Sequence, residues 1–304
     1  MDWILHNEYN INLKVLRYSF GLISSLPANI DILINLKKIY LNNNQLDTLP
    51  TTIGNLIKLQ ELYLNNNQLD TLPTTIANLI NLRVLNLANN KLSSLPVTIG
   101  NLINLKKLYL NNNQLDTLPK TISNLINLQV LNLSKNKLSS LPANIGNLIN
   151  LKKLYLNDNQ FDTLPKTIGK LINLQVLNLE NIKLSSLPTT IGNLINLQKL
   201  YLNNNQLDTL PTTIGNLINL KQLCLQHNKL SSLPAEIILI NNKIKIDETA
   251  YTITNLDIDC PILIFSELNI NISNLPINLN EIWLSKNIGK YDIKLPFNCK
   301  IIFF

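Results

Sequence analysis

The chain has 304 residues, of which 45% are hydrophobic and only 15% charged, with a formal net charge of +7. This apolar content excludes a disordered chain, and the small number of glycines, 8, excludes a collagen-like one. Because Asn or a charged residue interrupts every apolar run, no segment reaches the about 18 consecutive apolar residues of a membrane-spanning helix, and no membrane association is predicted.

The first predicted element is an N-terminal cap over residues 1–12. Its apolar residues Trp3, Ile4 and Leu5 are expected to cover the first strand of the fold. The segment has no basic stretch followed by a long apolar run, so the sequence predicts no secretory signal.

The cysteines also bear on location. Cys224, Cys260 and Cys299 are too far apart to indicate a disulfide framework or close-spaced zinc ligands. A reducing compartment is the simpler interpretation. We therefore expect a cytoplasmic protein, which for a viral protein would mean the host cytoplasm.

Residues 13–242 form the second element, a repeat with a period of 23 residues. Leu-Pro pairs recur at this spacing from Leu49-Pro50 to Leu233-Pro234. The unit at 59–79 reads Leu-x-x-Leu-x-Leu-x-x-Asn-x-Leu-x-x-Leu-Pro-x-x-Ile-x-x-Leu. Nine such units are preceded by a degenerate one in which Gly21 replaces the Asn, so ten repeats are predicted.

Two periodicities within one unit predict its local structure. The alternation of Leu62 and Leu64 indicates a short strand with one face buried. After Asn67 the apolar spacing changes, and Pro73 is incompatible with a continuing central strand, so the chain must return along the outside in a helical, 3-10 or extended segment. One unit cannot bury its apolar face alone. The predicted fold class is therefore α/β, a right-handed solenoid with a curved parallel sheet on its concave side and the returns on its convex side.

The repeated Asn is expected to point inward at the end of each strand. A buried amide must be paired, and Asn offers two donors and an acceptor, so these residues should form a ladder with backbone groups of adjacent turns. The predicted ladder consists of Asn44, Asn67, Asn90, Asn113, Asn136, Asn159, Asn205 and Asn228. Ile182 interrupts it, and we expect a weak point there, with a neighbouring backbone group lacking a partner.

These residues resemble leucine-rich repeats of the 23-residue intracellular type, which is similar to the repeats of Ras-group leucine-rich-repeat proteins and Scribble-like scaffolds. The resemblance covers about three quarters of the chain. The Asn- and Ile-rich texture also resembles repeat proteins of giant DNA viruses and amoebae. The resemblance implies a non-enzymatic protein-interaction scaffold that binds its ligands on the concave sheet.

The third element, residues 243–304, departs from the 23-residue frame. Apolar positions of 275–284 and 295–304 coincide at an offset of twenty, which predicts shorter, divergent repeats ending in a C-terminal cap. Further strands are predicted at 256–260, 262–265 and 268–272.

The chain ends in four apolar residues, Ile301, Ile302, Phe303 and Phe304, which we place on an edge strand. Exposed apolar edges favour pairing with another strand. These residues either fold over the last repeat as a cap or mediate self-association.

The strand positions between the leucines should face the concave side. The central one carries an aromatic column of Tyr40, Tyr63, Tyr109, Tyr155 and Tyr201, and an earlier one carries Lys38, Lys107, Lys153 and Lys199. Tyr is enriched at interaction hot spots, so these residues are the predicted binding site for a protein partner. Because alternate units are nearly identical, the column is alternatively a by-product of duplication.

The same residues suggest a weaker alternative, in which the Lys edge binds a polyanion or nucleic acid and the Tyr column stacks on bases. Strong phosphate binding requires clustered cations. Here acidic residues such as Asp47 and Asp70, one after each ladder position, offset the lysines.

An enzyme is the least supported class. The chain contains two histidines and no Gly-rich phosphate loop, dinucleotide-binding motif or HExxH motif. Cys224 and His227 could form a thiol nucleophile and base, but three strand residues span about 10 Å, which is beyond hydrogen-bond reach. No catalytic residue, cofactor or metal site is predicted.

Overall fold

The computed structural model describes residues 12–230 and 234 in full, together with the backbones of four strands between 245 and 303. The predicted N-terminal cap residues Trp3, Ile4 and Leu5 lie outside the described residues, as do Phe304 and the predicted strands at 256–260 and 268–272. The chain divides into two compact units, Met1–Leu154 and Tyr155–Phe304, each of which is described by itself.

Each repeat contributes one short strand, centred on a leucine or isoleucine of the repeat pattern. The strands are β1 (Val15–Arg17), β2 (Lys38–Tyr40), β3 (Glu61–Tyr63), β4 (Val84–Asn86), β5 (Lys107–Tyr109), β6 (Val130–Asn132), β7 (Lys153–Tyr155), β8 (Val176–Asn178), β9 (Lys199–Tyr201), β10 (Gln222–Cys224), β11 (Lys245–Asp247), β12 (Ile262–Phe265), β13 (Glu281–Leu284) and β14 (Lys300–Phe303). The alternation of leucines within the repeat thus produces the strands that it predicts.

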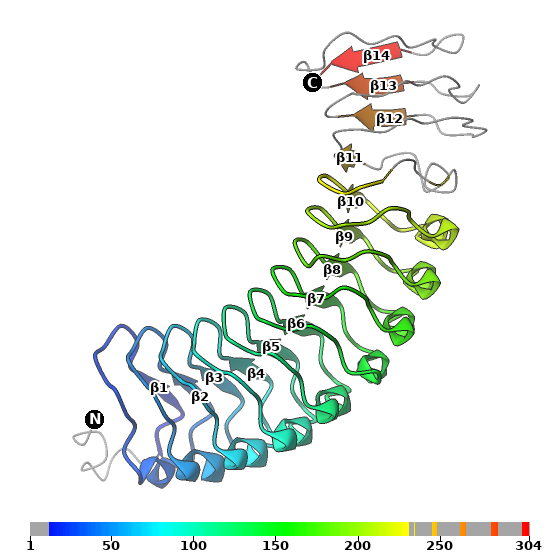
Figure 1. The fold of residues 1–304 in the computed structure, drawn as a ribbon. Helices are drawn as coiled ribbons and strands as arrows, with labels where there is room; N and C mark the ends of the chain where they lie inside the picture. Colours follow the sequence, from blue (N-terminus) through cyan, green and yellow to red (C-terminus); the bar gives the residue numbers. More distant parts are fainter. Residues whose placement is uncertain are drawn as a thin grey trace. The chain divides into compact units, whose positions relative to one another are not determined.

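The returns contain short 3-10 helices, most of which begin directly after the proline of a Leu-Pro pair. Proline fixes φ and has no amide hydrogen, so it ends the extended segment and suits the residue before the helix, as at Pro50 with φ −66° and ψ 146°. The helices are η2 (Ile30–Ile32), η3 (Thr51–Asn55), η4 (Thr74–Asn78), η5 (Val97–Asn101), η6 (Lys120–Asn124), η7 (Ile145–Asn147), η8 (Lys166–Lys170), η9 (Thr189–Asn193) and η10 (Thr212–Asn216). In each turn of the chain they lie on the side opposite the strand (Figure 1).

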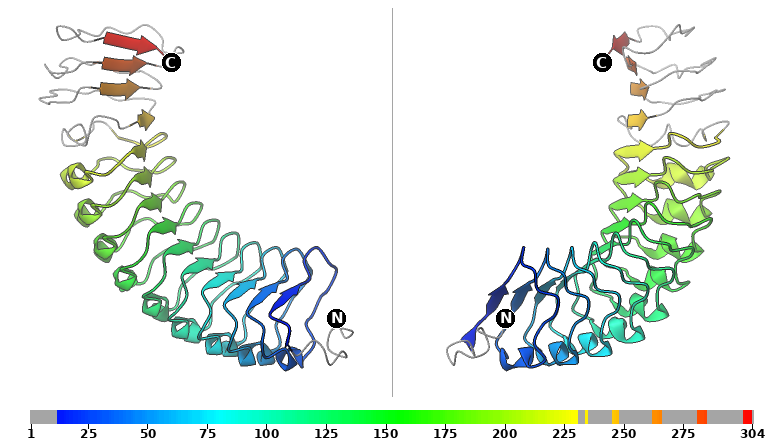
Figure 2. Two further views of the ribbon diagram at one scale, coloured as in Figure 1. Left: turned by 180° about the vertical axis from the view of Figure 1, so that it is seen from behind. Right: turned by 60° about the vertical axis from the view of Figure 1, so that its left-hand side comes forward.

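In the first unit, β1 to β6 pair in parallel and in sequence order, as Figure 2 shows from behind. Each residue pairs with the one 23 positions later, for example Lys38 with Glu61. The parallel strand-and-return arrangement predicted from the sequence is confirmed.

In the second unit, β8 to β14 also pair in parallel and in sequence order. The offset is 23 residues as far as the pair of β10 and β11 and then becomes 19, with Lys245 opposite Ile264 and Ile282 opposite Ile301. The twenty-residue offset inferred from the apolar positions is therefore one residue too long. The assignment of 243–304 to divergent repeats and a cap stays a prediction.

The space between strands and returns is filled by the leucines and isoleucines of the pattern. The central strand residues, such as Leu62 and Leu108, are completely buried, as are Leu64 and the return residue Ile53. Burying one such side chain contributes about 1.5–3 kcal/mol. The core therefore runs along the stack, and every turn depends on its neighbours for burial.

The Asn side chains at the strand ends connect adjacent turns. Asn67 Nδ2 donates to the carbonyl oxygens of Leu41 and Leu64, at 2.9 Å each, and its Oδ1 accepts a hydrogen bond from the Leu46 amide at 3.0 Å. Equivalent bonds are made by Asn90, Asn113, Asn136, Asn205 and Asn228. Asn159 donates to Leu156 in its own turn, whereas the buried Oδ1 of Asn44 has no partner among the described residues.

Ile182 replaces the ladder Asn in the second unit, and the hydrogen bonding around it changes. The Phe161 amide, which would face the ladder oxygen, makes no hydrogen bond within the described part of the chain. Both Ile182 and Phe161 are completely buried, and Phe161 stands where the other turns have Leu. The backbone of Lys183 adopts a positive φ of 66°. The ladder is therefore replaced here by an apolar contact region with one unpaired amide.

Restoring the ladder with Ile182→Asn is expected to raise the melting temperature by about 2–4 °C, which corresponds to about 1 kcal/mol in a chain of this size. The new amide would accept from the Phe161 amide and donate to the carbonyls of Leu156 and Leu179. Thermal unfolding followed by circular dichroism would measure the change.

The matched control is Ile182→Leu, since Leu has nearly the shape of Asn without its polar groups. This control should not raise the melting temperature. A fall of several degrees for Ile182→Asn would contradict the inward assignment of position 182.

Candidate functional site: the strand face

The first and third residues of each strand lie on one side of the sheet, which we call the strand face, because successive side chains in a strand alternate. All five tyrosines of the predicted column are half-buried; they are Tyr40, Tyr63 and Tyr109 in the first unit and Tyr155 and Tyr201 in the second. Of the predicted lysines, Lys107, Lys153 and Lys199 are exposed and Lys38 is half-buried.

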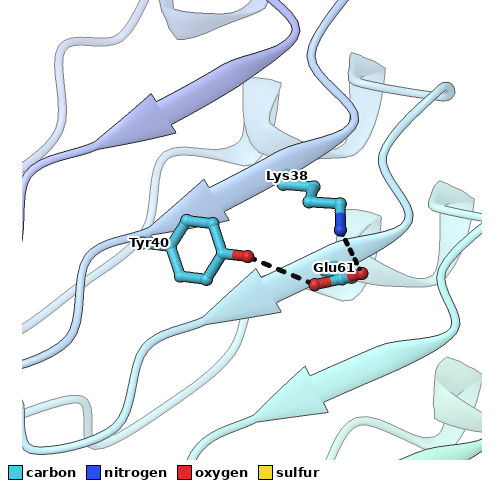
Figure 3. A network of polar contacts seen from close by, with 3 residues as sticks. All are labelled: Lys38, Tyr40 and Glu61. Atoms are coloured by element: carbon cyan, nitrogen blue, oxygen red, sulfur yellow. Dashed lines mark hydrogen bonds and ion pairs between the residues drawn. The ribbon is translucent and has the colours of Figure 1, made fainter.

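A polar network joins β2 to β3 at the start of the strand face (Figure 3). Lys38 Nζ lies 2.7 Å from Glu61 Oε1, and the Tyr40 hydroxyl donates to Glu61 Oε2 at 3.4 Å. The hydrogen bond and charge of Glu61 raise the pKa of Lys38 above its ordinary value. Lys38 is therefore already paired, unlike the free cation that the sequence suggested.

The same region contains an aromatic stack that the sequence analysis missed. The Arg17 guanidinium carbon lies 4.2 Å from the centre of the Tyr40 ring, and the Tyr40 and Tyr63 rings are stacked at 4.9 Å with an interplanar angle of 6°. Cation–π and stacked aromatic contacts of this kind are each favourable. Burial, followed by the charge of Glu61, raises the pKa of Tyr63. The signal was the position of Arg17, which pairs in register with Tyr40.

The Asn residues that alternate with the tyrosines serve their own turns. Asn86 Oδ1 accepts a hydrogen bond from the Ala88 amide at 3.1 Å, and Asn132 Oδ1 accepts one from the Ser134 amide at 3.1 Å. Asn178 does the same with Glu180 in the second unit. These short side chains are held by local bonds, so the aromatic residues are the larger contact groups on the strand face.

In the second unit, the strand face ends in a hydrogen-bonded chain of three residues. The Tyr201 hydroxyl donates to Gln222 Oε1 at 3.1 Å, and Gln222 Nε2 donates to Cys224 Sγ at 3.6 Å. Burial, followed by the nearby Cys224, raises the pKa of Tyr201. Cys224 pairs in register with Tyr201, and His227 is exposed in the turn that follows β10.

The acidic residues beyond the ladder are exposed and bonded locally. The carboxylate of Asp70 accepts from the Thr71 hydroxyl at 3.0 Å, and that of Asp116 accepts from the Thr117 hydroxyl at 3.1 Å. Within residues 12–230, no three His, Cys, Asp or Glu side chains come together as metal ligands. The helices of the described chain are all too short or too polar to cross a membrane.

Comparison with known proteins agrees with this architecture. A model described as a leucine-rich repeat region matches residues 81–178 and 139–241, and one described as two copies of leucine-rich repeats matches residues 34–79. Neither is a catalytic family. A search of the curated proteins gives no match.

Solved structures give the same result. The leucine-rich-repeat protein LIC12759 of Leptospira interrogans is 32% identical, with a TM-score of 0.73 over 88% of this chain and 77% of that one. A TDR receptor is 25% identical, with a TM-score of 0.68 over 94% of this chain. The plant peptide hormone receptor RGFR1, in complex with RGF2, is 24% identical, with a TM-score of 0.62 over 93% of this chain. The chain spans 53% of the length of each receptor chain.

The matched segments, from 34–79 and from 81 to 241, cover more than half of the 304 residues. The Leptospira protein is similar to it over most of both chains. The chain belongs to the leucine-rich-repeat family.

Proposed function

We propose that the protein is a non-enzymatic scaffold that binds a protein partner on its strand face. Leucine-rich repeats are commonly protein-interaction modules, and RGFR1 is a relative in fold that is described with a bound peptide hormone. The observation that carries the proposal is the column of half-buried tyrosines above a completely buried leucine layer.

The physical basis of binding is a surface that is formed before the partner arrives. The leucine core and the Asn ladder hold each strand in place, so little conformational entropy is lost on association. A tyrosine ring supplies a large, rigid contact area with a polar end. Exposed lysines such as Lys107 and Lys199 would orient a partner rather than supply most of the affinity.

We further propose that the repeats are of the 23-residue intracellular type and that the protein is cytoplasmic. The register of 23 residues from β1 to β6 and the dispersed cysteines support this assignment. A likeness to giant-virus and amoebal repeat proteins has its support in the Asn- and Ile-rich composition.

The test is a pull-down from an extract of the source cell with the wild type and a Tyr109→Ala/Tyr155→Ala variant. We expect the double variant to recover at least tenfold less of the specific partner, because each truncated hot-spot residue costs about 2 kcal/mol of binding free energy. Equal recovery by the two proteins would refute the role of the tyrosine column.

A further inference from the structure

A polar cavity lies in the first unit, where the chain enters β4 and β5. Its volume is about 290 Å³, and it is lined by Asn81, Arg83, Asn104, Lys106 and Asn127. Arg83 directly precedes β4, and Lys106 directly precedes β5. The cavity therefore adjoins the two strands whose third residues are Asn86 and Tyr109.

The amide groups of the cavity are fixed in orientation. Asn81 Nδ2 donates to the carbonyl of Ile57 at 2.8 Å, Asn104 Nδ2 to that of Ile80 at 2.8 Å, and Asn127 Nδ2 to that of Ile103 at 2.9 Å. Each Nδ2 carries a second hydrogen. The cavity thus offers amide donors at positions set by the backbone of the preceding turn.

The cations of the cavity are adjacent and have no acidic partner. The Lys106 amide donates to the Arg83 carbonyl at 2.8 Å, so the two residues stand side by side in neighbouring turns. Both side chains are exposed, and neither forms an ion pair with any residue that the structure describes. They contrast with Lys38, whose charge is paired by Glu61.

The pairing of these two cations is a departure from the repeat. At the equivalent positions the chain has Lys37, Gln60, Arg83, Lys106, Gln129, Lys152, Gln175, Gln198 and Lys221. Arg83 and Lys106 are the one place in this series where two consecutive repeats both carry a cation. Since Gln129 and Gln175 occupy the Arg83 position in the units of the same text, copying of a two-repeat block does not account for Arg83.

We infer that this cavity, the Arg83–Lys106 pocket, binds a carboxylate from an acidic segment of the protein partner. A guanidinium matches a carboxylate with two parallel hydrogen bonds, and the lysine and the amides add further donors. A nucleic acid would need a continuous track of cations, and Gln60 and Gln129 interrupt the track on both sides. The inference rests on the proposed function, because it assigns part of the partner's chemistry.

The second unit supplies the matched comparison. There Asn196 and Asn219 make the same backbone bonds, to Ile172 and Ile195, but Gln175 and Gln198 stand in place of the cations. The amide frame is thus present without the charges. Gln175→Arg/Gln198→Lys should create a second pocket.

The experiment measures the binding of a fluorescent hexaglutamate peptide to the full chain by anisotropy at low salt. Arg83→Gln/Lys106→Gln should weaken binding by about tenfold or more, because hydrogen bonds to charged groups are lost. Lys152→Gln/Lys221→Gln removes the same charge from separated positions and should change the affinity by less than twofold. Gln175→Arg/Gln198→Lys should raise the stoichiometry from one peptide to two.

Equal weakening by the two Gln double variants would overturn the inference, because it would show only a general effect of charge. Tighter binding of an oligothymidylate than of the peptide, with the same two variants equally affected, would indicate a polyanion surface and would also overturn it. The pull-down separates this inference from the proposed function. Loss of the partner by the Tyr109/Tyr155 variant but not by the Arg83/Lys106 variant would refute the pocket alone. The reverse pattern would refute the tyrosine column alone.

Discussion

Asn113→Ala is expected to lower the free energy of unfolding by about 3–4 kcal/mol, because each buried polar group left without a partner costs about 1–3 kcal/mol. Asn113 Nδ2 donates to the carbonyls of Leu87 and Leu110, at 2.9 and 3.0 Å, and Oδ1 accepts from the Leu92 amide at 3.0 Å. Removing the amide leaves all three backbone groups without this partner, inside a leucine core that admits little water.

Urea unfolding followed by circular dichroism measures this loss as a shift in the midpoint. The control is Asn111→Ala, the same substitution two residues earlier, where the half-buried side chain makes no hydrogen bond to any residue that the structure describes. The control should cost no more than about 0.5 kcal/mol. Equal midpoints for the two variants would show that the ladder does not connect the turns energetically.

The second large effect is expected at Gly100, where adjacent returns approach closely. A Cβ at this position would lie against the Thr121 carbonyl oxygen and 2.8 Å from the Thr121 Cβ. Gly100→Val is expected to destabilise the fold by about 2–3 kcal/mol, as for other overpacked sites. Thermal and urea unfolding would both report the change.

The chain contains its own precedent for a smaller change at this position. Ala77 occupies the equivalent site, and the hydrogen bond from the Thr98 hydroxyl to the Thr74 carbonyl beside it is 3.1 Å, compared with 2.6 Å between Thr75 and Thr51. One methyl group is thus accommodated by a small separation of the turns. Gly100→Ala should therefore cost clearly less than Gly100→Val, and equal costs for the two variants would argue against the close approach as the cause.

Local structure follows closely from the sequence because several signals in each repeat agree. The alternation of Leu62 and Leu64 predicts a strand, and Pro73 predicts its end and the start of the return. The unpaired Phe161 amide also lies beside Ile182, where the break in the Asn pattern predicted a missing partner. In the C-terminal segment the repeat is degenerate, so the apolar pattern alone left the offset uncertain by one residue.

The details of the strand face depend on contacts between repeats, which no single repeat contains. The sequence identified Lys38 and Tyr40 as surface residues but not their connection through Glu61, because Glu61 lies in the next turn. The stack of Arg17 on Tyr40 likewise requires the register between β1 and β2. Side-chain direction explains the difference between Asn86 and Tyr109, since the amide of Asn86 is used by its own turn.

The most direct test of the account compares two double variants in partner capture. Tyr109→Ala/Tyr155→Ala truncates one strand-face residue in each unit, and Ile126→Ala/Ile172→Ala truncates one return residue in each, where the isoleucines are each 50% exposed. The account predicts that the tyrosine variant loses the specific partner and that the isoleucine variant recovers as much as the wild type. Loss of the partner by the isoleucine variant, with full recovery by the tyrosine variant, would contradict the assignment of binding to the strand face.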